Sequence, residues 1–91
     1  MPSIEIKRKH DKTLAEGRKA IERVARHIAE KFDVKWGWEA NTLHFQRSGV
    51  DGHIALSAKQ VHVTVNLGFL LMAIRSSVER EIHRYLDEEF G

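Results

Sequence analysis

Residues 34–66 contain four short segments in which apolar and polar residues alternate, separated by gaps too short for a helix. Alternation at every second position is typical of strands that bury one face. Strands joined by such short connections pair antiparallel, with one apolar and one polar face. This part of the chain therefore predicts an antiparallel meander. Its inward-facing residues are Val34, Trp36, Trp38, Leu43, Phe45, Ile54, Leu56, Val61, Val63 and Val65.

Three polar or small dipeptides separate these segments and predict tight turns. They are Ala40-Asn41, Asp51-Gly52 and Ala58-Lys59. Asp-Gly is a strong hairpin signal. Residues 49–52 could also close as a four-residue loop, so the register of this hairpin stays open.

The flanking regions predict one more strand and two helices. Ile4 and Ile6 alternate with polar residues, as in a half-buried strand. Thr13 and Glu16 have the spacing of a capping box, which predicts a helix over residues 13–32. A second helical period covers residues 69–89. The expected buried stripes are Leu14, Ile21, Val24, Ala25, Ile28 and Phe32, then Leu71, Ile74, Val78, Ile82, Tyr85 and Leu86.

The order strand, helix, four strands, helix predicts an α+β fold in one domain, residues 1–91. We expect a single five-stranded, antiparallel, curved sheet with both helices on its apolar face. The first strand is expected to return beside the last and to close the sheet around the final helix. This layout is similar to that of the helix-grip fold.

Composition narrows the class of partner. The chain has 15 basic and 13 acidic residues, with a net charge of +2 and no one-sided basic stripe. We therefore expect no nucleic-acid binding. The absence of cysteine fits a reducing cytoplasm. The longest apolar run is far shorter than the roughly 20 residues of a membrane-spanning helix, so no membrane span is expected.

No nucleophile, base or phosphate-binding loop forms a catalytic pattern, so we expect neither an enzyme nor a cofactor. Three of the six histidines, His44, His53 and His62, fall on the polar face of neighbouring strands. Such an arrangement suggests a three-imidazole zinc site. The preferred strand pairing places His62 opposite Ala55, and this register does not bring the three histidine side chains together. We therefore expect surface histidines and no metal.

Residues 67–74 form the most apolar run in the chain. Three interpretations are open: burial under the edge of the sheet, a homodimer interface, or contact with an apolar phase. A second candidate is an apolar pocket between the sheet and the last helix, as an alternative to plain core packing. Its lining would come from Trp36, Trp38 and Phe45.

Three segments carry a resemblance to a known family. They are residues 2–10, including Pro2, Arg8 and His10, the hairpin of residues 43–52, and residues 67–71 together with the tail of residues 85–90. Together they resemble the small bacterial polyhydroxyalkanoic acid system proteins, which are associated with storage-polyester granules or their regulation. The family pattern has a basic residue after the Leu-Leu pair, where this chain has Met72-Ala73.

The resemblance implies a cellular context and no reaction. We therefore expect a non-enzymatic cytoplasmic protein that contacts a polyester granule surface or a granule protein through the start of the last helix. Homodimerisation through the same surface is a further expectation. The alternative is a carrier of a small hydrophobic ligand, such as an acyl chain, in the pocket named above. The expected contact residues are Phe69, Leu70, Leu71 and Met72.

Overall fold

The computed structural model describes residues 3–91. Pro2, in the first of the resembling segments, lies outside the described residues. The order of elements is the predicted one, and the described part of the chain has no helix between residues 34 and 66. The elements are β1 (Ile4–Lys9), α1 (Leu14–Phe32), β2 (Lys35–Glu39), β3 (Thr42–Arg47), β4 (Val50–Leu56), β5 (Gln60–Leu67), the 3-10 helix η1 (Phe69–Ile74) and α2 (Arg75–Phe90).

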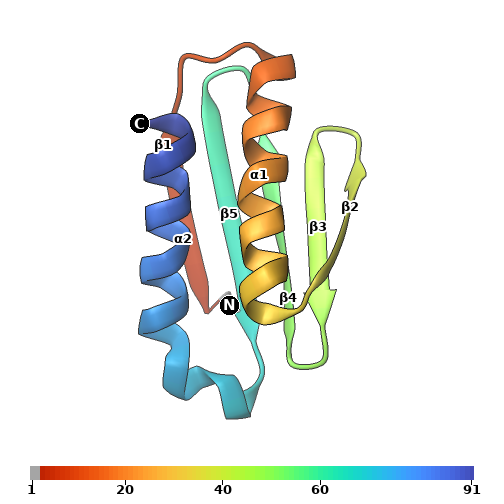
Figure 1. Cartoon of the computed structure of the whole chain (residues 1–91), viewed down its shortest axis with the longest axis vertical. Helices are drawn as coiled ribbons and strands as arrows, with labels where there is room; N and C mark the ends of the chain where they lie inside the picture. Colours follow the sequence, from red (N-terminus) through yellow and green to blue (C-terminus); the bar gives the residue numbers. More distant parts are fainter. Residues whose placement is uncertain (1–2) are drawn as a thin grey trace.

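The five strands form one antiparallel sheet in the order β1-β5-β4-β3-β2. The prediction that the first strand lies beside the last is confirmed, since Ile4 pairs with Val65 and Ile6 with Val63. Both helices lie side by side on one face of the sheet (Figure 1). The sheet is open, with β1 and β2 at its edges, so α2 packs beside α1 and is not enclosed by strands.

The core lies between the two helices and the sheet. The predicted strand alternation is confirmed in β5, where Val61, Val63 and Val65 are buried and the residues between them are not. The predicted capping box begins α1, because Thr13 Oγ1 accepts a hydrogen bond from the amide of Glu16 and Glu16 Oε1 accepts one from the amide of Thr13, each at 3.1 Å. Leu14 was expected in the buried stripe but is 42% exposed, because it occupies the first position of this helix at the molecule's end.

The β3–β4 turn is not at the predicted Asp51-Gly52. The turn falls at Ser48-Gly49, where Gly49 has a φ of +84° that few other residues adopt. Gly52 lies inside β4 and faces Phe45 across the strand pair. Since a Cβ there would come within 2.6 Å of Phe45 Cζ, this glycine makes room for an aromatic ring instead of making a turn.

The last α-helix was predicted to begin at Phe69, but it begins at Arg75. The six residues of η1 precede it and have 3-10 geometry, with no side-chain cap at Gly68. The amide of Gly68 donates to Gly49 O at 2.7 Å, which holds the segment against the β3–β4 turn. This tertiary contact overrides the helical period of the apolar run, and Ile74 is consequently 42% exposed where burial was expected.

Candidate functional site

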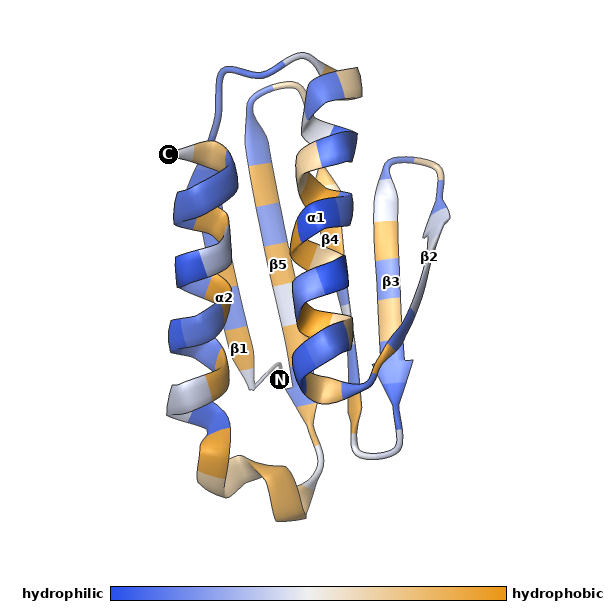
Figure 2. Ribbon diagram, in the orientation of Figure 1, coloured by the Kyte–Doolittle hydropathy of each residue, from blue (hydrophilic) through white to orange (hydrophobic). Residues whose placement is uncertain are grey.

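The apolar run emerges at one end of the molecule. Phe69 is 91% exposed, Leu70 is 86% exposed and Met72 is 45% exposed. We call Phe69, Leu70 and Met72 the apolar tip. Figure 2 shows a mainly apolar connection between β5 and α2 at this end, with a pale stretch directly after β5. Within residues 3–91 no side chain of η1 is fully buried, so the interpretation of this run as core is wrong for Phe69 and Leu70.

Hydrogen bonds fix the apolar tip to the rest of the fold. Ser3 Oγ accepts from the amide of Leu67 at 3.0 Å and lies 3.5 Å from Met72 Sδ. The Arg75 guanidinium donates to the carbonyl of the same serine. On the other side, Gly68 approaches Gly49 so closely that a Cβ at Gly68 would lie 3.3 Å from Gly49 Cα. These contacts fix the backbone of η1, from which the exposed side chains project.

An apolar cavity of about 120 Å³ lies under η1, between the ends of both helices and the sheet. Leu71, which was expected among the contact residues, lines the cavity from η1. Ile74 lines the cavity as well, although this residue is 42% exposed. Its walls come from five elements and their connections. They are Ile28, Phe32, Val34, Phe45, Val50, Val65, Leu67, Val78 and Ile82, with Lys31 and Arg47.

The structure places only part of the predicted aromatic pocket at this cavity. Phe45 lines the cavity, whereas Trp36 and Trp38 line a shallow hollow along the outer strand β2. Trp38 Nε1 donates to Glu22 Oε2 at 2.7 Å, and the Arg18 guanidinium lies 4.0 Å from the centre of the Trp38 ring. Trp38 therefore links the edge strand β2 to α1. The prediction that Trp36, Trp38 and Phe45 line one pocket is wrong.

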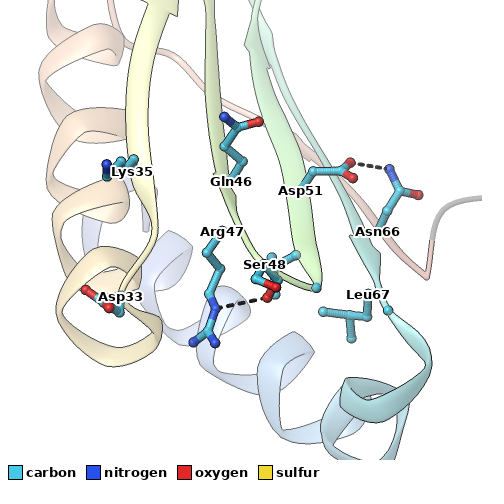
Figure 3. A pocket seen from close by; sticks show the side chains of 11 residues that line it. Asp33, Lys35, Gln46, Arg47, Ser48, Asp51, Asn66 and Leu67 are labelled. Carbon is cyan, nitrogen blue, oxygen red and sulfur yellow. Dashed lines mark hydrogen bonds between the residues drawn. The ribbon is translucent and has the colours of Figure 1, made fainter.

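Arg47 stands where the cavity meets the surface. Its Nη1 donates to Phe32 O at 3.0 Å and its Nε donates to Ser48 O at 3.2 Å. Figure 3 shows this side chain reaching from the end of β3 beside a wide, open hollow of about 690 Å³. Among the residues that the structure describes, no carboxylate lies within 4.0 Å of the Arg47 guanidinium. Its positive charge is thus held in place by main-chain carbonyls alone.

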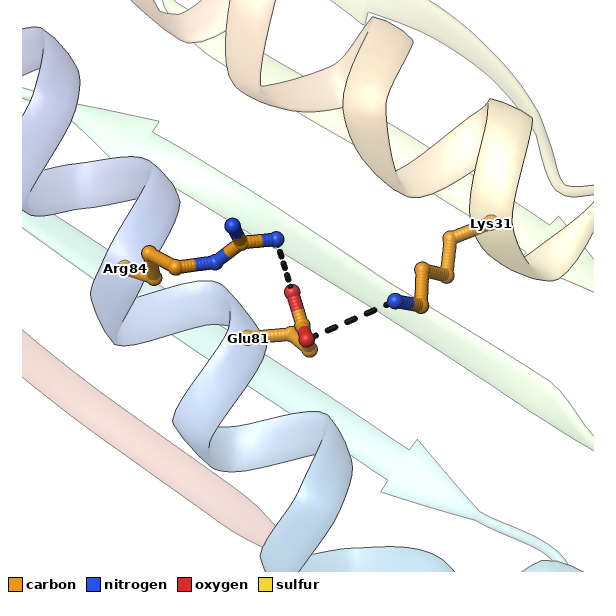
Figure 4. Close-up of polar contacts among 3 residues, drawn as sticks. All are labelled: Lys31, Glu81 and Arg84. Atoms are coloured by element: carbon orange, nitrogen blue, oxygen red, sulfur yellow. Dashed lines mark hydrogen bonds and ion pairs between the residues drawn. The ribbon is translucent and has the colours of Figure 1, made fainter.

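The second cation at the cavity, Lys31, has a carboxylate partner. Lys31 Nζ lies 3.4 Å from Glu81 Oε1, and Arg84 Nη2 lies 2.6 Å from Glu81 Oε2 (Figure 4). The hydrogen bond from Arg84, together with the charges of Arg84 and Lys31, lowers the pKa of Glu81 below its ordinary value of 4.5. This group links α1 to α2 across the solvent-facing side of the helix pair.

The polar face of the sheet brings two of the three histidines together. His44 pairs with His53, with ring centres 5.9 Å apart. His62 lies opposite Ala55, as the preferred pairing predicted, and its Nε2 is 2.9 Å from Glu5 Oε2. Over residues 3–91 no three His, Cys, Asp or Glu side chains converge in a way that could hold a metal ion.

Sequence reasoning predicted an apolar pocket between the sheet and the last helix, but it missed Arg47 and most of the residues that line the cavity. Arg47 was part of a resembling segment but carried no pattern of its own. The only available signal was a basic residue shortly after the inward-facing Phe45 and before the turn at Ser48.

The comparisons with known proteins agree with the resemblance. The family model for the polyhydroxyalkanoic acid system protein (PHA_gran_rgn) matches residues 4–90. No curated protein and no solved structure matches the chain. None of the helices over residues 3–91 combines the length and the apolar character that crossing a bilayer requires. Because the family model covers nearly the whole chain, this protein belongs to the polyhydroxyalkanoic acid system family.

Proposed function

We propose that this protein is a non-enzymatic, cytoplasmic component of the polyhydroxyalkanoate system that adsorbs to a polyester granule through the apolar tip. The observation that carries the proposal is the exposure of Phe69 and Leu70, at 91% and 86%. Adjacent large apolar side chains exposed to this degree at the end of a small protein are typical of a contact surface.

The size of the apolar tip favours an apolar phase over a stable homodimer. A specific protein interface usually engages about 20–30 residues on each side. The tip offers three prominent side chains on a short 3-10 helix. Such a projection can insert into the surface of a polymer without needing a complementary folded partner.

The expected strength of adsorption follows from the exposed side chains. Burying Phe69 and Leu70 would contribute about 1.5–3 kcal/mol each, and the half-exposed Met72 would add to this. The loss of conformational freedom is small because η1 is already held by Gly49 and Ser3. A total of about 4 kcal/mol corresponds to a dissociation constant near 1 mM, so single molecules exchange rapidly and coverage depends on concentration.

The test is co-sedimentation with purified polyester granules, using Phe69→Glu combined with Leu70→Glu. We expect granule binding to fall to background, because insertion would desolvate two carboxylates. The matched control is Leu14→Glu with Ala15→Glu, which adds the same charge at the far end of α1, where both residues are exposed. The control should bind as the native chain does.

Thermal melting separates loss of contact from loss of fold. Both tip substitutions lie on exposed side chains, so the free energy of unfolding should change by no more than about 0.5 kcal/mol per site. A folded double variant that still sediments with granules would overturn the proposal. If the native chain dimerises and the double variant is monomeric, the tip is a homodimer interface and the granule proposal fails.

A further inference from the structure

We propose that the cavity under η1 is a binding site for a short-chain alkanoate, with the hydrocarbon tail inside and the carboxylate on Arg47. This site is separate from the apolar tip, and the proposal does not depend on adsorption to a granule. It rests on three observations, namely the volume of the cavity, its lining and the charge at its mouth.

The volume sets the length of the ligand. An apolar cavity of about 150 Å³ can accommodate benzene, so one of about 120 Å³ takes roughly five carbon atoms. A long acyl chain does not fit, since pockets for drug-sized molecules are about 300–1,000 Å³. The matching class is an acid of about four to six carbons, with the carboxylate outside the apolar space.

The lining sets the character of the tail. Side chains from both helices and from β3, β4 and β5 present hydrocarbon to the cavity, and Phe32 and Phe45 add two aromatic rings. Lys31 and Arg47 are the charged residues among the lining, and both are cationic. A carboxylate at the mouth would therefore meet favourable charge, while a second polar group deep inside would find no hydrogen-bond partner among these hydrocarbon walls.

Arg47 is the better anion partner of the two cations. Lys31 is already engaged by Glu81 at 3.4 Å, whereas within residues 3–91 the hydrogen bonds of the Arg47 guanidinium go to the main-chain oxygens of Phe32 and Ser48. Those two bonds orient the guanidinium and use Nε and Nη1, which leaves Nη2 to donate to an incoming carboxylate. Guanidinium–carboxylate pairing gives a strong, charge-assisted hydrogen bond.

The first experiment titrates the native protein with sodium butanoate, hexanoate, octanoate and decanoate while recording methyl NMR spectra. We expect saturable shifts of the methyl groups of Val65, Val78 and Ile82, which line the cavity, and none at Leu43, which does not. Affinity should rise up to about fourfold per methylene from butanoate to hexanoate. The increase should then stop, because the cavity is full.

The second experiment tests the charge contact with a cycle of protein and ligand variants. Hexanamide has nearly the shape of hexanoate but no charge. Arg47→Gln should weaken hexanoate at least tenfold and leave hexanamide nearly unchanged. The matched control, Arg80→Gln, removes the same charge from the exposed side of α2 and should leave both affinities unchanged.

Three outcomes would overturn the proposal. The first is the absence of saturable methyl shifts with hexanoate at millimolar concentration. The second is an affinity that keeps rising to decanoate, which would indicate surface adsorption. The third is equal weakening of hexanoate and hexanamide by Arg47→Gln, which would show that Arg47 only caps the end of α1. The double variant Phe69→Glu, Leu70→Glu, which is expected to lose granule binding, should still bind hexanoate. The two proposals can therefore fail independently.

Discussion

The clearest structural prediction concerns Gly52, which lies at a crowded point of the sheet. A Cβ at this position would lie 2.5 Å from Thr64 O and 2.6 Å from Phe45 Cζ. Neither neighbour can retreat easily, since Thr64 O belongs to the backbone of β5 and Phe45 is only 3% exposed. Gly52→Ala should therefore destabilise the fold even though alanine is the smallest possible addition.

The magnitude follows from the cost of overpacking a core. Added carbon atoms in a well-packed interior cost about 1–3 kcal/mol, and two contacts this short place Gly52→Ala at about 3 kcal/mol. For a domain of this size each kcal/mol lowers the melting temperature by about 4–8 °C. We thus expect a fall of about 12–24 °C, measured by thermal or urea denaturation followed by circular dichroism.

Gly37→Ala is the matched control. Gly37 lies in the edge strand β2, where an added Cβ would have no heavy atom within 4 Å and where φ is not positive. Both substitutions restrict the unfolded chain equally, an effect that stabilises by about 0.4–1 kcal/mol where no clash opposes it. The difference between the two variants therefore isolates the clash at Gly52.

A third variant identifies the neighbour responsible. If the ring of Phe45 causes most of the strain, Gly52→Ala should cost less in a Phe45→Leu background than in the native chain. A melting temperature for Gly52→Ala within about 3 °C of that for Gly37→Ala would refute the argument that the missing side chain makes room for the ring.

Two further predictions concern metal and pH. Zinc in modest excess should leave the melting temperature unchanged, because a metal that bound only the native state would raise it; a rise abolished by His44→Ala and His62→Ala would disprove this. The pKa of Glu81 is lower in the folded protein than in the unfolded chain, so the ionised carboxylate stabilises the fold. This stabilisation is fully present above the unfolded pKa and is lost as the pH falls through the folded pKa. Urea unfolding midpoints should therefore decline less in Glu81→Gln than in the native chain between about pH 5 and pH 3, and equal declines would contradict the role given to Glu81.

Local patterns in the sequence determined the kind and order of the elements. The two-residue period of Val61, Val63 and Val65 specifies a strand with one buried face wherever that strand lies. The capping box of Thr13 and Glu16 satisfies free amides within a single turn, so it needs no tertiary partner. Short connections then require antiparallel pairing, which is why the sheet could be predicted from the sequence.

Only the tertiary structure decided what Gly49, Gly52 and the apolar run do. The dipeptide Asp51-Gly52 is compatible with a turn, but Gly52 is needed inside β4 because Phe45 occupies the space of its side chain. Residues 67–74 are apolar at every position but Gly68, and no local pattern separates the inner from the outer side chains of this run. The segment docks on Gly49, and in this position Leu71 lines the cavity while Phe69 and Leu70 point toward solvent.

The cavity and its cation depend on contacts between parts of the chain that are distant in sequence. Arg47 acquires its orientation from the carbonyl of Phe32, at the end of a helix that precedes it by 15 positions. Val65 and Ile82 meet at the cavity because α2 runs back along the sheet beside α1. Hydrophobic periodicity shows which face of each element is apolar, but the space left between the faces depends on the packing of whole elements. For this reason the sequence alone indicated an apolar contact surface and an apolar pocket, but it could not indicate which residues line the cavity or which cation lies at its mouth.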